Sequence, residues 1–237
     1  MLSSLMNNDF LYFDYYLCRF HTYKIKTISR SYREKILSAF NDIEYDVNKE
    51  MDRILHEYPF NPDFDNPEDI MEHAYEKGIE YGIDLSEAKC LFIAVLAIAL
   101  YHDWQKSIIT FLKKEIGRNN PVPNISKWVH IKKWLKKYDT QLETFYFFHD
   151  LNELRLVANS IKHGEGSSLN KLRKLNSTIL LPKENGECSY SAGEYSLLGV
   201  SLYIEQSDLE RYEEALLKFW DHQFWLSIGE RRCRKYK

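Results

Sequence analysis

The sequence predicts a mainly α-helical protein, an antiparallel helical bundle that forms one domain over residues 1–237. Apolar residues recur every three or four positions through most of the chain, as on helices that pack along one face. Only 9 Gly and 6 Pro interrupt 237 residues. A hydrophobic fraction of 44% with 28% charged residues is typical of a globular chain with its own core.

The first third of the chain predicts amphipathic helices. Apolar residues at helical spacing over residues 10–58 predict one or two of them. The proline-rich stretch 58–69 ends this pattern. Asn66 is placed to cap the next helix, whose first residue is a proline, and this helix is expected to reach about residue 81.

A long helix is expected next, over residues 87–116, capped by Ser86 and ended by Gly117. Its first part, "CLFIAVLAIAL" at residues 90–100, is the most apolar run. Eleven residues fall short of the ~20 that a membrane span needs. We therefore expect a buried helix and no membrane association.

The second half begins with a short basic helix, residues 127–139, capped by Ser126. Its lysines could contact a phosphate backbone, although a row of lysines is just as often a solvated face. A membrane-surface role is the weaker interpretation, because so short a helix with two Trp packs readily on its own core. The lysines considered for RNA are Lys132, Lys133 and Lys136.

The remaining elements are two helices, a β insertion and a last helix. Helices are expected over residues 140–163 and 168–175. Residues 177–205 change to a period of two around Asn-Gly and Ala-Gly turns, which predicts a small β-hairpin. Residues 208–229 then predict one final helix, followed by a basic tail.

The most informative stretch is the end of the helix over residues 140–163. Arg155, Asn159 and His163 share one side of this helix and could converge on a ligand. His163, next to a C-terminal glycine, could instead only cap the helix, as could Lys162. Spacing alone favours the capping interpretation, and the arginine could equally pair with a nearby carboxylate.

A family resemblance favours the functional interpretation. "NELRLVANSIKHGEGSS" resembles the motif helix of the HEPN superfamily (higher eukaryotes and prokaryotes nucleotide-binding), a group of all-helical domains. That motif is an Arg, four to six residues and a His, often with an Asn after the Arg. Asn159 and His163 match this spacing. Ala158 stands where the commonest form has Arg, and seven residues separate Arg155 from His163.

The resemblance implies an RNA-binding protein, and its candidate activity is that of a metal-independent ribonuclease of a bacterial toxin or phage-defence system. The RNA 2′-OH would attack the adjacent phosphorus, with His163 as general acid or base and Arg155, with Lys162, stabilising the phosphorane. The resemblance also implies a homodimer with facing motif helices and no cofactor or metal. The displaced arginine favours the alternative, a non-catalytic HEPN-like module that assembles with an operon-encoded protein partner.

A second polar turn follows the apolar run. His102 and Lys106 share a helix face and could complete a cleft opposite the motif helix, although a boundary histidine is the commoner role. Trp104 could stack on a base, but a core tryptophan is more usual.

Other enzyme classes fit less well. His-Asp pairs at residues 102–103 and 149–150 raise the HD-domain phosphohydrolases, but the surrounding sequence lacks that family's other features. Di-iron bundles need paired Glu-x-x-His turns, and the sequence contains none.

The net charge and the cysteine spacing limit which partners and which cellular location are expected. A net charge of −3 gives no global attraction to nucleic acid, so any polyanion site must be local. The spacing of the four Cys predicts neither a zinc ribbon nor a dense disulfide framework, and residues 1–16 lack the basic segment of a signal peptide. We expect a cytoplasmic protein.

Overall fold

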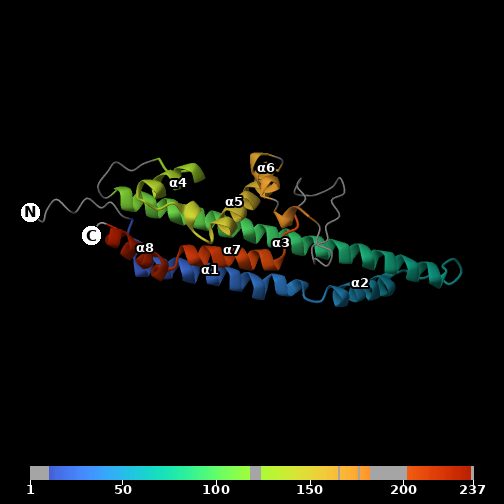
Figure 1. Cartoon of the computed structure of the whole chain (residues 1–237). Helices are drawn as coiled ribbons and strands as arrows, with labels where there is room; N and C mark the ends of the chain where they lie inside the picture. The colour runs from blue at the N-terminus through green and yellow to red at the C-terminus, as the bar shows by residue number, and fades with distance from the viewer. Residues whose placement is uncertain (1–10, 118–123, 165, 176, 182–201, 236–237) are drawn as a thin grey trace, which may run out of the picture.

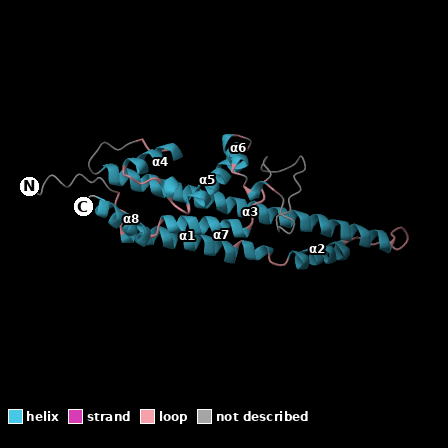
Figure 2. Cartoon of the chain, in the orientation of Figure 1, coloured by secondary structure: helices cyan, strands magenta, loops and turns pink. Residues whose placement is uncertain are grey.

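The computed structural model describes residues 11–117, 124–164, 166–175, 177–181 and 202–235. Within these residues all regular structure is helical, as Figure 2 shows. The mainly α-helical prediction is therefore confirmed. The α-helices are α1 (Tyr15–Lys35), α2 (Ile43–Glu57), α3 (Pro67–Gly117), α4 (Trp128–Lys137), α5 (Phe148–His163), α6 (Ser167–Lys174), α7 (Gln206–Phe219) and α8 (His222–Lys235).

Helix α3 runs along most of the molecule and organises it (Figure 1). Its second half forms the centre of the main body, with α1, α7 and α8 on one side and α4, α5 and α6 on the other. The core of this body is rich in large aromatic side chains, which contact one another across α3, α7 and α8. They include Trp104, Phe219, Trp220 and Trp225.

The predicted interruption of α3 at Ser86 is wrong. The helix is continuous from Pro67 to Gly117, the start and end that the sequence predicts. The Ser86 hydroxyl donates to the carbonyl of Gly82, one turn back, at 2.9 Å. A serine inside a helix makes this bond instead of capping a new one.

The first part of α3 pairs with α2 to form a helical hairpin, the arm, which we define as residues 42–88. It projects from the body at one end of the molecule (Figure 1). A Cβ at Gly82 would lie 2.9 Å from Cγ2 of Val47, and one at Gly78 would lie 2.8 Å from Sδ of Met51. The two glycines, one turn apart, therefore permit the close approach of α2 to α3.

The predicted last helix is in fact two helices. α7 ends at Phe219, and α8 starts at His222. The Asp221 carboxylate accepts from the backbone N–H of Gln223 at 3.0 Å, as a capping residue does, so it starts a new helix. Trp225 Nε1 donates to the carbonyl of Phe219 at 2.6 Å and holds α8 against the end of α7.

Two predictions before α7 need correction. The helix expected over residues 140–163 starts only at Phe148, after a short 3₁₀ turn, Leu142–Thr144. Of the β insertion over 177–205, residues 182–201 lie outside the described part. The described flanks form no strand and contain a 3₁₀ turn, Thr178–Leu180. One backbone hydrogen bond, from Tyr203 N–H to the carbonyl of Ile179 at 2.7 Å, joins these flanks.

The start of α4 also differs from the prediction. Lys127, not Ser126, is the N-cap residue of α4, and it makes no side-chain cap bond. In the described part of the chain, no helix combines the length and apolar character that crossing a bilayer requires.

Cys90 is disulfide-bonded. Disulfides are rare in the cytosol, so the expected cytoplasmic location stays a prediction.

Candidate functional site

The motif helix α5 is packed on most sides and open along one. Its buried residues face α3, α6 and α7. The open side, which we call the polar strip, lies within an arc of about 100° and is about 16 Å long. It consists of Asn152, Arg155, Asn159, Lys162 and His163, of which the last two are exposed.

Arg155 is half-buried at the centre of this strip. Its Nε and Nη2 both donate to Oδ1 of Asn152, at 3.2 and 2.8 Å. Its Cζ lies 5.0 Å from the ring centre of Trp128, at the start of α4. A guanidinium near an aromatic ring at this distance makes a cation–π contact. These contacts fix the arginine between α4 and α5.

The charge of Arg155 has no counter-ion among the described residues. Burial lowers the pKa of its guanidinium, and its other electrostatic neighbour is Tyr101. The carboxylates of Asp150 and Glu153, which come shortly before Arg155 on the same helix, bind Arg211 instead. A partly buried cation without a carboxylate is costly unless a ligand supplies the anion. This is the strongest chemical indication in the structure.

Asn159 connects the strip to α3. Its Nδ2 donates to the carbonyl of Arg155 at 2.7 Å. Burial raises the pKa of Tyr101 to about 12, while the positive charge of Arg155 and a hydrogen bond with the Asn159 side chain partly oppose this shift. Tyr101 is therefore a neutral phenol at physiological pH and can only share hydrogen bonds, not a charge, with the strip.

His163 stands apart from the other two residues predicted as catalytic. Its α-carbon is about 12 Å along the axis from that of Arg155, and the guanidinium turns toward Asn152, away from His163. The His163 side chain is exposed and hydrogen-bonds to no described residue. Gly164, at φ 65°, closes the helix through its N–H to the carbonyl of Ser160 at 2.8 Å. The structure thus brings Arg155 and Asn159 together and leaves His163 at the end of the same strip.

In the polar turn of α3, residues 101–106, the side chain that reaches α5 is not the predicted one. Tyr101, rather than His102, interacts with α5. The His102 ring is half-exposed against Tyr101, with ring centres 5.5 Å apart, and Lys106 is exposed. Trp104 is 1% exposed, inside the core, so it cannot stack on a base.

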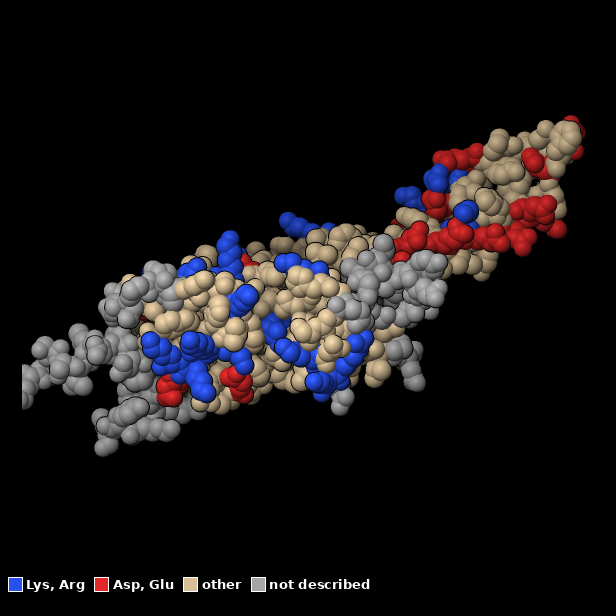
Figure 3. Space-filling view, turned by 90° about the horizontal axis from the view of Figure 1, so that it is seen from above, with Lys and Arg blue, Asp and Glu red and all other residues tan. Residues whose placement is uncertain are grey.

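Basic side chains gather on the same side of the body as the polar strip. Figure 3 shows Lys and Arg spread over the body, whereas Asp and Glu concentrate on the arm. Of the three α4 lysines predicted to bind RNA, Lys132 pairs with Glu143 at 2.5 Å, whereas the other two are exposed. Exposed basic residues near the strip are Lys127, Lys133, Lys136 and Lys137 around α4, and Lys171, Arg173 and Lys174 on α6.

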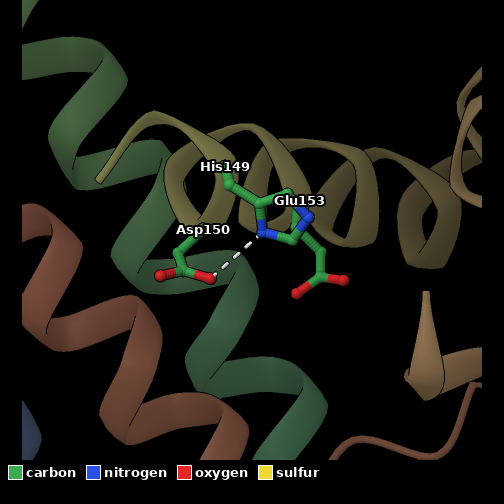
Figure 4. A group of neighbouring side chains, drawn as sticks. All are labelled: His149, Asp150 and Glu153. Atoms are coloured by element: carbon green, nitrogen blue, oxygen red, sulfur yellow. Dashed lines mark hydrogen bonds and ion pairs between the residues drawn. The ribbon is translucent and has the colours of Figure 1, made fainter. Parts of the chain in front are cut away.

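A second cluster on α5 has the composition of a metal site. Figure 4 shows His149, Asp150 and Glu153, whose potential ligand atoms all lie within 4.8 Å of one another. His149 Nδ1 lies 3.4 Å from Oδ1 of Asp150. The two carboxylates, however, already bind Arg211 of α7, at 2.5 and 2.7 Å. A cation would have to displace this guanidinium.

Glu153 is the structural centre of that cluster. Its side chain is 3% exposed and accepts hydrogen bonds from Arg211 at 2.7 Å, Tyr212 at 3.2 Å and Ser177 at 2.6 Å. Burial, followed by the charge of Glu153, raises the pKa of the Tyr212 phenol. The cluster therefore joins α5 to α7, and its two carboxylates are already paired with a cation of the protein, Arg211.

The aspartates of the two His-Asp pairs, which raised the HD-domain alternative, also form ion pairs within the protein. Asp103 forms an ion pair with Lys24 of α1, and Asp150 pairs with Arg211. Both aspartates of the two His-Asp pairs thus connect helices of the body.

Three residues of the site, Asn152, Trp128 and Tyr101, are not among those that the sequence predicts. Asn152 could have been found, since it lies on the strip three residues before Arg155. Trp128 and Tyr101 come from α4 and α3, and no spacing within α5 indicates them.

Comparisons with protein-family models, with curated proteins and with solved structures found no match to this chain.

Proposed function

We propose that this chain is a single-stranded RNA-binding protein and that the polar strip of α5 is its phosphate-binding site. The observation that carries the proposal is the half-buried guanidinium of Arg155, which has no carboxylate partner among the described residues. A phosphate would supply the missing anion, and arginine suits phosphate because it can donate two parallel hydrogen bonds.

The surroundings of Arg155 favour RNA over a small anion. Trp128 is half-exposed, with the guanidinium over its ring and Phe148 stacked near it at 6.4 Å, and its exposed part could contact a base. The strip is long enough to contact more than one nucleotide, and the exposed lysines of α4 and α6 supply a local positive field. A positive groove with an aromatic platform is the usual arrangement for binding single strands without sequence preference.

The second candidate function is metal-independent cleavage of the bound RNA, as the HEPN resemblance implies. It is favoured by one observation, the exposed His163 ring at the end of the same strip. The separation of His163 from the Arg155 guanidinium speaks against assembly of both groups on one phosphate. We therefore place binding first and cleavage second, and the defence or toxin setting and an operon-encoded partner remain predictions.

Charge reversal within the strip tests the proposal. Lys162→Glu places a carboxylate two turns from Arg155, and we expect it to weaken binding of a fluorescent single-stranded RNA by about tenfold, measured by anisotropy at low salt. The matched control is Lys49→Glu on α2, an exposed lysine on the arm, which should bind as the wild type does.

Equal affinity of both variants would contradict the proposed site. The same RNA, incubated with EDTA and run on a denaturing gel, separates the two functions. Cleavage by the wild type that disappears in His163→Ala would establish the second candidate, whereas binding of intact RNA by both proteins would leave the first.

A further inference from the structure

The arm and the outer side of α1 each expose an apolar stripe, and the two stripes carry opposite charge. We propose that they bind each other between two copies of the chain, so that the arm of each copy packs along α1 of its partner in a two-fold dimer. This surface lies on the other side of the body from the polar strip and is independent of the proposed RNA site.

The arm has too many exposed apolar side chains for an isolated hairpin. No residue of α2 is buried. Along α3 an apolar side chain is exposed at every fourth position from residue 71 to residue 83, at 46 to 62%. Contiguous exposed apolar surface of this kind marks an interaction site. The stripe consists of Met71, Tyr75, Ile79 and Ile83, and at the tip Phe64 is 86% exposed.

The outer side of α1 shows the complementary pattern. Tyr16, Phe20 and Tyr23 follow one another at helical spacing and are 62 to 79% exposed. A groove of about 460 Å³ runs beside this stripe, between α1 and the junction of α7 and α8. Its walls include Tyr15, Arg19 and Lys26 of α1 and Lys218 and Trp220 of the junction, together with the carboxylates of Glu214 and Asp221. The groove is aromatic and mixed in charge, so what it offers is space for an exposed aromatic side chain such as Phe64.

Charge decides which surfaces meet. Residues 42–88 contain 15 Asp and Glu and 3 Lys and Arg, a net charge of −12, and since the whole chain carries −3, the other residues carry +9. The α1 helix contributes six Lys and Arg and one Glu to this positive charge. Two arms would repel each other, whereas an arm and a basic α1 attract. The stripe of an arm therefore favours α1 of a second copy over a second arm.

The arrangement of the helices makes the pairing reciprocal. α1 and α2 follow one another along the same edge of the molecule, and the start of α1 and the tip of the arm lie at opposite ends (Figure 1). A two-fold axis between two antiparallel copies would bring each arm tip to the groove of the other copy. Both contacts then form at once, as in an isologous dimer.

Complementary charge reversals test this dimer in the full chain. The arm variant is Glu72→Lys with Glu76→Lys, and the α1 variant is Lys26→Glu with Arg30→Glu, all at exposed positions. By sedimentation velocity at low salt, we expect the wild type at twice its 28.3 kDa mass and each variant alone to dimerise at least tenfold more weakly. An equal mixture of the two variants should regain the dimer, because both contacts then join opposite charges.

The matched control reverses two exposed lysines on α4, Lys136→Glu with Lys137→Glu, and should leave the dimer intact. A wild type that stays monomeric at the highest soluble concentration would overturn the proposal. So would a mixture of the arm and α1 variants that regains no dimer, or an α4 variant that loses it as fully as the α1 variant.

Discussion

Glu153→Ala is expected to lower the free energy of unfolding by about 3 kcal/mol, because it removes the shared partner of three side chains. The carboxylate is buried and connects Arg211 and Tyr212 of α7 with Ser177. In the variant the Tyr212 hydroxyl loses its acceptor inside the core. In a chain of this size the melting temperature should fall by roughly 10 °C, which thermal unfolding followed by circular dichroism would measure.

The control for this prediction is Glu143→Ala, which removes an exposed carboxylate paired with Lys132 and should change stability little. Glu153→Gln keeps an oxygen acceptor and should lose less than Glu153→Ala. If Glu153→Ala melted like the wild type, α5 and α7 would not depend on this cluster.

Arg155→Leu should have two opposite effects. RNA affinity should fall by at least tenfold, since the cation that receives the phosphate is gone. The melting temperature should stay equal or rise, because leucine can still pack on Trp128 and the half-buried charge has no carboxylate partner among the described residues. Anisotropy titration and thermal unfolding on the same preparation would measure both.

Arg33→Leu is the matched control for this double effect. Arg33 pairs with Glu213 at 2.9 Å, so its loss leaves a mostly buried carboxylate unpaired and should destabilise the fold without changing RNA affinity. A loss of stability in Arg155→Leu with unchanged RNA binding would make Arg155 a structural residue.

The helices could be predicted where local signals decide them. Asn66 and Pro67 mark the start of α3, and Gly117 marks its end, as the structure confirms. Ser86 misled because the same hydroxyl that caps a helix can bond to the preceding turn, and packing against α2 favours continuity. The break at Asp221 was missed because the apolar pattern continues through it, while Trp225 folds back onto Phe219.

The candidate site, too, could be predicted from the sequence only in part. Arg155, Asn159 and His163 share the open side of α5, as the 3.6-residue period predicts. The direction of the Arg155 side chain could not be predicted, because it depends on Asn152 and on Trp128 from another helix. Likewise, the arm with its separated charge results from the pairing of α2 with α3, which no local spacing indicates.

Photocrosslinking to RNA that contains 4-thiouridine, followed by mass spectrometry of the crosslinked peptides, tests the RNA site most directly. The wild type should crosslink at Trp128 and at peptides of α5, and Arg155→Leu should lose these crosslinks. Crosslinks confined to the exposed aromatic residues of α1, unchanged in Arg155→Leu, would contradict the assignment of the polar strip as the RNA site.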